Sequence, residues 1–355
     1  MTPAEKKRMP SLRTLWKPAL YHGDGARPPF FEGWYFKLVD ATEAHRYAVI
    51  PGVFIGREPA ASHAFVQTLD GATGRTTYHR YPFDDFRADP HEFDVQVGPN
   101  RFRLDRIALD IDAPELRMRG ELRFSGLTPW PVTRTSPGVM GPYTFAPFME
   151  CYHGVLSFDH TIAGNLAVDG RELDFTGGHG YIEKDWGQAF PKAWIWTQSN
   201  HFGADARGAP LTTSLTASVA IIPWLRGACP GFIVGLRHDG QLYRFATYTG
   251  AATERLDLDD AHVIWHMSGR AGPDRTPHRL EIVAWRAEGG LLHAPERSAM
   301  LQRVLESLTA RLDVRLMSVE GGRERVVFDG TGRHAGLEIM GPIDEIRQMA
   351  QGKGR

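Results

Sequence analysis

The 355-residue sequence has few cysteines and almost no net charge. Its two cysteines, Cys151 and Cys229, lie far apart and form no C-x-x-C motif, which argues against a zinc or redox site and favours a reducing compartment. The formal net charge is −1, with 41 basic and 42 acidic residues. We therefore expect no nucleic-acid partner and no strong electrostatic attachment to an anionic membrane.

Long apolar segments are also missing. No run of about 18 apolar residues is present, so no transmembrane helix is expected. The N-terminal stretch "MTPAEKKRMPSLRTLWKPAL" is basic but lacks the apolar region of a secretory signal. We predict a cytoplasmic protein that contacts a membrane surface at most transiently, and the sequence leaves its oligomeric state open.

The common catalytic and cofactor motifs are absent. The sequence contains no G-x-G-x-x-G after a strand, no Walker A motif, no H-E-x-x-H and no G-x-S-x-G. The 15 histidines are scattered. His262 and His266 lie four residues apart, but in the expected strand they would stand about 13 Å from each other. We therefore predict neither a metal nor a cofactor.

The sequence is instead rich in short runs that alternate in polarity. "FFEGWYFKLV" predicts a strand covered on both faces, and "ELRMRGELRFSGL" has period-two alternation. "DGATG" and the triplet His238-Asp239-Gly240 predict hairpin turns. Strands recur roughly every 8–12 residues, which is typical of a sandwich or barrel and predicts an all-β fold.

Two segments interrupt this pattern. Residues 126–148 contain five prolines and predict an irregular segment long enough to act as a lid or crossover. Residues 294–312 carry an apolar stripe with helical spacing, which predicts one short helix: Met300, Leu301, Val304, Leu305 and Leu308. A boundary near residues 185–205 would leave two halves with similar numbers of strands.

Two clusters place an acid among apolar residues. Glu32 lies beside Trp34 and Tyr35 in "FFEGWYFK", and Glu150 lies within "PFMECYHG". Either acid could be a carboxyl group in an apolar cavity, with a pKa raised by desolvation. Either could equally be one partner of an ion pair, because a buried carboxylate without a partner is costly.

The third cluster, "GYIEKDWGQAFPKAWIWTQSNHF", mixes ionisable groups with indoles. If it is a strand, Glu183 and Asp185 share a face and raise each other's pKa, while Lys184 faces away. A turn would break this geometry. The faces of Trp186, Trp194 and Trp196 could stabilise a cation or simply form an aromatic core. The combination predicts an apolar small-molecule pocket with a few polar groups.

At these residues the sequence resembles the tocopherol cyclase family. The similar pieces are "FFEGWYFK", "PFMECYHGVLS", "GHGYIEKDWGQAFPKAWIWTQSNHF" and "GLEIMGPI", which occur in the family's order and cover most of residues 28–345. Plant members have Asn where this sequence has Asp185. The resemblance implies a lipocalin-like fold of two β-barrel halves in tandem. The expected division is a polar leader 1–27, halves 28–195 and 196–345, and a flexible tail 346–355.

The resemblance also implies a cofactor-free ring closure on a prenylated hydroquinone. An acid protonates the alkene, aromatic walls shelter the tertiary cation, and the phenol oxygen closes a chromanol ring. The proton-donor candidates are Glu183 and Asp185, followed by Glu32 and Glu150, with His179 and Tyr181 as alternative shuttles. Ligand contacts are expected from Trp34, Lys184, Trp186, Trp194 and Trp196, and Gln198 or Asn200 would orient the phenol.

Two other functions fit the same residues. A carrier of lipids or terpenoids would bind its ligand in the same barrel without protonating it. A hydratase would share the protonation step, with water in place of the phenol as the nucleophile.

Overall fold

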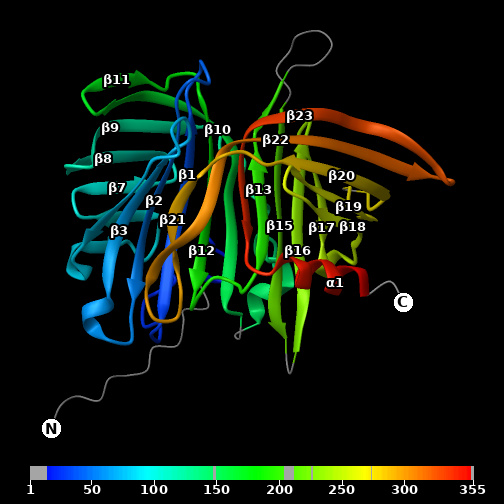
Figure 1. Ribbon diagram of the computed structural model, residues 1–355, viewed down its shortest axis with the longest axis horizontal. Helices are drawn as coiled ribbons and strands as arrows, with labels where there is room; N and C mark the ends of the chain where they lie inside the picture. Colours follow the sequence, from blue (N-terminus) through cyan, green and yellow to red (C-terminus); the bar gives the residue numbers. More distant parts are fainter. Residues whose placement is uncertain (1–13, 147–148, 204–211, 225–226, 273, 353–355) are drawn as a thin grey trace.

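Two antiparallel β-sheets in tandem make up nearly the whole molecule (Figure 1). The computed structural model describes residues 14–146, 149–203, 212–224, 227–272 and 274–352. The first sheet has 12 strands in the order β4-β3-β2-β1-β12-β10-β9-β8-β7-β6-β5, with β11 beside β10. Its strands are β1 (Phe30–Val39), β2 (Arg46–Ile55), β3 (His63–Asp70), β4 (Thr76–Tyr81), β5 (Phe86–Ala88), β6 (Asp94–Val97), β7 (Asn100–Arg103), β8 (Arg106–Ala113), β9 (Leu116–Ser125), β10 (Cys151–Val168), β11 (Arg171–Asp174) and β12 (His179–Gly187).

The second sheet has 11 strands and follows directly in the chain. Its order is β17-β16-β15-β13-β23-β22-β20-β19-β18, with β14 beside β23 and β21 beside β22. The strands are β13 (Trp194–Ser199), β14 (His201–Phe202), β15 (Thr213–Trp224), β16 (Gly227–His238), β17 (Gln241–Ala246), β18 (Ala252–Leu258), β19 (His262–Arg270), β20 (Pro277–Trp285), β21 (Gly290–Pro295), β22 (Met300–Glu320) and β23 (Arg323–Met340). The predicted all-β fold with two halves in tandem is confirmed.

The segments with alternating sequence patterns form strands, as predicted. Strand β1 is buried along nearly its whole length, because β2 and β12 flank it and both of its faces are covered. The predicted hairpin between β16 and β17 also forms. Asp239 and Gly240 both have positive φ, 47° and 77°, which a two-residue type I′ turn requires.

The predicted position of the short helix is wrong. Residues 300–320 form strand β22, and the helix of the C-terminal half is α1 (Ile343–Gly352). In β22 the buried side chains follow a period of two, as Leu308, Ala310 and Leu312 show, whereas Leu301 and Leu305 are exposed. Pairing with β20, β21 and β23 on both sides satisfies the backbone of β22, so tertiary context outweighs the helical spacing of its leucines.

The ends of the predicted division lie partly outside the described residues. Residues 14–27 of the leader are described, and Leu20 is buried there. Helix α1 occupies part of the segment assigned to the tail, and Ile346 on this helix is buried against the second half. No helix among the described residues is long and apolar enough to cross a bilayer.

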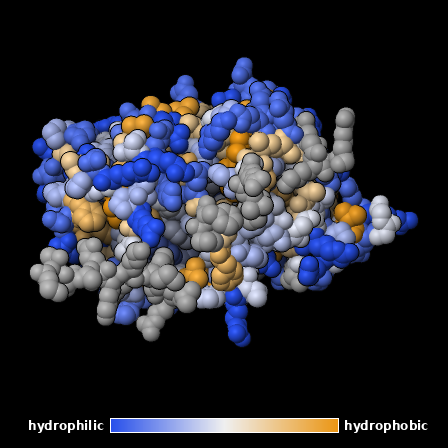
Figure 2. Space-filling model, turned by 90° about the horizontal axis from the view of Figure 1, so that it is seen from below, coloured by the Kyte–Doolittle hydropathy of each residue, from blue (hydrophilic) through white to orange (hydrophobic). Residues whose placement is uncertain are grey.

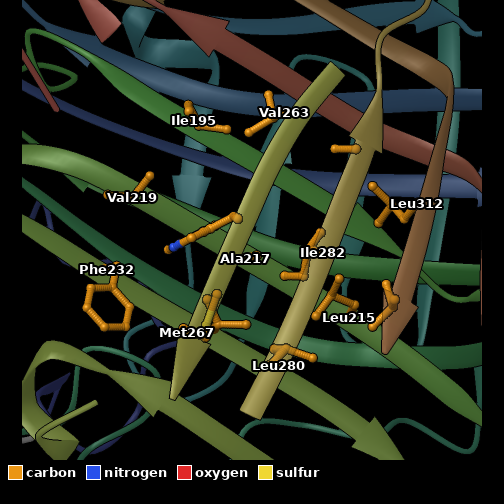
Figure 3. Close-up of a cluster of buried hydrophobic side chains, with 14 of the residues drawn as sticks. Ile195, Leu215, Ala217, Val219, Phe232, Val263, Met267, Leu280, Ile282 and Leu312 are labelled. Atoms are coloured by element: carbon orange, nitrogen blue, oxygen red, sulfur yellow. The ribbon is translucent and has the colours of Figure 1, made fainter. Parts of the chain in front are cut away.

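Each half has its own apolar core. Figure 3 shows part of the C-terminal core, where Ile195, Val263 and Leu312 come from β13, β19 and β22. A third buried cluster lies where the halves meet and includes Tyr35, Trp194 and Trp196. In the view from below, hydrophobic residues appear as scattered areas on a largely hydrophilic surface (Figure 2).

The proline-rich segment between β9 and β10 is irregular, as predicted. Its regular structure among the described residues is one short 3₁₀ helix, η4 (Gly141–Phe145), and an isolated bridge between Val132 and Pro137. Trp130 and Met140 from this segment are buried in the cluster between the halves. The segment therefore helps to close the space where the halves meet.

Candidate functional site

Strand β12 presents different chemistry on its two faces. The segment from His179 to Gly187 is a strand, so Glu183 and Asp185 lie on one face and Lys184 on the other. Its neighbours are β1, where Tyr35 pairs with Glu183, and β10, where His153 pairs with Asp185. The strand alternative is confirmed, and the turn alternative is wrong.

The Lys184 face is closed by an ion pair, here called the core ion pair, between Lys184 Nζ and Glu32. Both side chains are fully buried. The backbone N–H of His22 donates to Glu32 Oε2 at 2.8 Å, and the Lys184 ammonium lies 4.9 Å from the ring centres of Trp34 and Trp186. Burial alone would raise the pKa of Glu32, but Lys184 and His22 together outweigh burial and lower that pKa. Glu32 is therefore ionised.

The opposite face of β12 borders a cavity of about 460 Å³ between the two halves. Its wall is mainly apolar and aromatic, with Trp194 and Trp196 of β13 side by side on one face. Gly336 of β23 gives Trp196 its place, because a Cβ on this residue would lie 2.6 Å from the indole ring. The ionisable residues that line the cavity are Tyr35, Cys151, His153, Glu183, Asp185, Cys229, His293, Glu306 and Glu338, with Tyr143 near them on η4.

Three of these residues form a group that we call the first acid centre: His153, Glu183 and Asp185. His153 Nδ1 lies 2.9 Å from Asp185 Oδ1, and His153 Nε2 lies 3.7 Å from Glu183 Oε2. The Tyr181 hydroxyl and the Trp196 indole N–H both donate to Glu183 Oε2, at 2.5 and 3.1 Å. Among the described residues both of these donors bind Oε2. An oxygen that accepts two hydrogen bonds is the poorer site for a proton, so we assign the proton of Glu183 to Oε1.

The charges of the first acid centre follow from its burial. Desolvation raises the pKa of Glu183 to about 7, and Asp185 adds to the rise against the opposing effect of His153. Burial alone would lower the pKa of His153, but Asp185 and Glu183 raise it to about 9. Near neutral pH the centre thus combines an imidazolium with a carboxyl group that keeps its proton in part.

The cavity holds a second pair of acids that sequence reasoning missed, here called the second acid pair: Glu306 and Glu338. They face each other across the ladder between β22 and β23. The Tyr35 hydroxyl donates to Glu306, and the Trp194 indole N–H donates to Glu338 at 2.6 Å. Desolvation raises the pKa of both, to about 8 for Glu338. Glu306 was hidden in the wrongly predicted helix, although a period-two reading would have put it on the buried face with Val304.

The other acids and shuttles of the sequence prediction lie outside the cavity wall. Glu150 pairs with Arg297 at 2.5 Å on a partly exposed surface. His179 Nδ1 lies 3.0 Å from Asp159, away from the cavity. Tyr181 does not line the cavity but touches its acid through the hydrogen bond to Glu183.

Several of the predicted ligand contacts also lie elsewhere. Trp34 and Trp186 pack on the Lys184 side of β12. Gln198 Oε1 accepts a hydrogen bond from the buried Lys37 at 2.6 Å, and Asn200 donates to Asp159 at 2.8 Å. Of the tryptophans proposed to bind ligand, Trp194 and Trp196 line the cavity.

The first acid centre also has the spacing of a cation site. One ligand atom from each of its three residues lies within 4.8 Å of the others. A metal would need the neutral imidazole and two carboxylates, whereas the raised pKa values of His153 and Glu183 favour their protonated forms. A metal bound there would have to displace these protons, so its affinity would depend on pH.

Known proteins resemble this chain over most of its length. Residues 121–341 match a family described as tocopherol cyclase-like. The chain is 26% identical to the chloroplastic tocopherol cyclase of Zea mays, over 96% of this chain and 80% of the relative. It is also 26% identical to a protein from Oryza sativa subsp. japonica that is named as a probable chloroplastic tocopherol cyclase, over 90% and 77%.

A solved structure shares the fold. It comes from Nitrosomonas europaea and is provisionally described as an AttH protein. The TM-score is 0.50 at 13% sequence identity, and the match covers 96% of this chain and 98% of the other. At this identity the likeness supports the fold alone.

Proposed function

Because the chain belongs to the tocopherol cyclase-like family, we propose that it closes a chromanol ring on a prenylated hydroquinone by protonating an alkene. The observation that carries the proposal is a carboxyl group, Glu183, with a raised pKa in the wall of an aromatic cavity. Protonation of an alkene needs an acid of this kind in a place from which water is largely excluded.

Glu183 acts as the proton donor. The neighbouring imidazolium of His153 makes the loss of the proton easier, because positive charge stabilises the carboxylate that remains. Asp185 holds the imidazole through its hydrogen bond to Nδ1 and keeps it charged. Tyr181 and Trp196 bind Glu183 Oε2 and so fix the orientation of the carboxyl group.

The aromatic wall stabilises the cation that follows protonation. Trp194 and Trp196 present negatively charged π faces, and Tyr35 packs edge-on against Trp196 with ring centres 5.6 Å apart. The tertiary cation would be attacked by the phenol oxygen of the same substrate molecule. The cavity of about 460 Å³ lies in the range of small-molecule sites and takes the reacting end of a long prenyl chain.

The test is to incubate the purified protein with a phytylated hydroquinone at pH 6 and measure chromanol formation. The expected result is turnover above the acid background, lost in Glu183→Gln with ligand affinity retained. A carrier would bind the ligand equally well in both proteins and form no chromanol. A hydratase would give a tertiary alcohol instead.

The location and partners remain predictions. The expected partner is a hydrophobic small molecule, delivered by transient contact with a membrane surface. The sequence predicts a cytoplasmic location, whereas the plant relatives are named as chloroplastic.

A further inference from the structure

The second acid pair faces the same cavity as the first acid centre but has different partners. Both Glu306 and Glu338 line the cavity, and Glu306 is 1% exposed. The two residues lie opposite each other across the β22–β23 ladder, and the charge of Glu338 helps to raise the pKa of Glu306. Because ionisation of one carboxyl group opposes ionisation of the other, the pair loses its two protons in separate steps, and between these steps it consists of an acid and a carboxylate.

No cation in contact balances this pair among the described residues. Neither glutamate lies within 4 Å of a lysine, arginine or histidine nitrogen, whereas Glu183 has His153. The groups that influence the pair are Tyr35, Lys37, Glu183 and Asp185. Lys37 favours ionisation of Glu306 from a distance, but its own ammonium is bound to Gln198 and the carbonyl of His334.

The two acidic groups are set side by side by β13. The indole N–H of Trp196 binds Glu183, and that of Trp194 binds Glu338. Two residues apart on a strand, the Cα atoms of these tryptophans lie roughly 7 Å from each other, at about 3.3 Å per residue, so the two acids bind to neighbouring side chains on one face of β13. Both indoles also line the cavity. A substrate with an alkene at one end of its reacting part and a hydroxyl at the other spans such an interval.

We infer that Glu306 and Glu338 form a second acid–base site in this cavity, which binds a free phenolic hydroxyl of the substrate and takes its proton as the ring closes. This inference rests on the proposed function and divides the reaction between two groups. The first acid centre supplies the proton to the alkene, and the second acid pair removes one from the phenol.

The steps balance as an isomerisation. The Glu183 O–H bond breaks, and the alkene π electrons form a C–H bond, which leaves a tertiary cation. A lone pair of the phenol oxygen forms the C–O bond, and the phenolic proton passes to the carboxylate of the pair. Glu183 is then ionised and the pair doubly protonated. One proton returns to Glu183 through water that enters the emptied cavity before the next turnover.

Binding of a phytylated hydroquinone and of its dimethyl ether, followed by quenching of tryptophan fluorescence, tests the pair without relying on turnover. The ether keeps the ring and the prenyl chain but carries a methyl group on each oxygen and has no hydroxyl to donate. The wild type and Glu183→Gln should bind the hydroquinone at least 10-fold more tightly than the ether. Glu306→Gln and Glu338→Gln should lose this preference, whereas Glu150→Gln, whose acid lies outside the cavity, should keep it.

Chromanol formation provides the second measurement. Glu306→Gln and Glu338→Gln should each lower kcat by up to about 10²- to 10⁴-fold, because either change breaks the pair that accepts the phenolic proton. Glu150→Gln should leave kcat unchanged. If the wild type forms no chromanol, the proposed function fails, and the binding preference still decides whether the pair reads a hydroxyl.

The inference is overturned if the two glutamine variants keep both the wild-type rate and the preference for the free hydroxyl. If neither variant folds, the wild type alone decides, because equal affinity for the hydroquinone and its ether would overturn the inference. The inference would be supported if the wild type prefers the hydroquinone to its ether and Tyr35→Phe, which removes the hydrogen bond to Glu306, abolishes that preference.

Discussion

Strand β12 carries two acid–base groups that face in opposite directions and behave differently. On one face the core ion pair of Glu32 and Lys184 is fully buried, and each charge has its partner. On the other face the cavity has four carboxyl groups: Glu183, Asp185, Glu306 and Glu338. Among the described residues His153 is the one cationic group within 4 Å of any of them. A buried acid must meet a cation or keep its proton, and β12 shows both solutions one residue apart.

The largest expected effect is the loss of the core ion pair. Glu32→Gln leaves the Lys184 ammonium buried without its counter-charge, which should lower the free energy of unfolding by about 3–5 kcal/mol. Urea unfolding at pH 7 measures this loss. Glu150→Gln, which breaks the partly exposed pair with Arg297, is the control and should cost less than about 1 kcal/mol. A similar small loss in Glu32→Gln would contradict the assigned charges.

The same substitution on the other face, Glu183→Gln, should affect the reaction rate and leave stability almost unchanged. Glu183→Gln replaces a protonated acid by a neutral group of the same shape, so stability at pH 6 should change by no more than about 1 kcal/mol. The rate of chromanol formation should fall by about 10²- to 10⁴-fold, because the proton donor is gone. If Glu183→Gln loses as much stability as Glu32→Gln, or forms chromanol at the wild-type rate, the two faces of β12 do not differ as described.

The second acid pair should make stability depend on pH. The pKa of Glu338 is raised to about 8 from an ordinary value of 4.5, so between these limits the native state holds a proton that the unfolded chain has released. Stability therefore falls as pH rises through this window, by up to about 1.4 kcal/mol per pH unit for such a group. Glu338→Gln should flatten the decline between pH 5 and 8 in urea unfolding. Parallel curves for wild type and variant would show that Glu338 ionises normally.

The smallest expected effect concerns Asp185. Asp185→Asn removes the main influence that raises the pKa of His153 above its ordinary value, so this pKa should fall from about 9 by more than one unit. An NMR titration of the imidazole C–H signals measures the shift. The fold should be unaffected, because Asp185 is partly exposed. An unchanged titration would mean that Glu183 alone keeps the imidazole charged.

Much of the fold could be read from local sequence patterns. Period-two alternation and turn residues such as Asp239-Gly240 indicate strands and hairpins, because these signals depend on neighbours in the chain. The helix in residues 294–312 was misplaced, since leucines four apart fit a helix equally well. Pairing of β22 with strands far away in the sequence decides its conformation.

The site was only partly predictable for a related reason. Strand alternation is local, so it correctly separates Glu183 and Asp185 from Lys184. Which acid meets a cation depends on residues distant in the chain, such as Glu32 with Lys184 and Glu150 with Arg297. His153 and Glu306 were missed because they reach the cavity from β10 and β22, beside partners that only the folded sheets bring near.

The most direct measurement is the protonation state of Glu183 itself. Infrared difference spectra between wild type and Glu183→Gln, recorded from pH 5 to 9, isolate the carbonyl band of its carboxylic acid form. A band that is present at pH 6 and disappears with a midpoint near 7 is the expected result. A Glu183 that is already a carboxylate at pH 5 would contradict it, since the cavity would then hold no acid at this position to start the reaction.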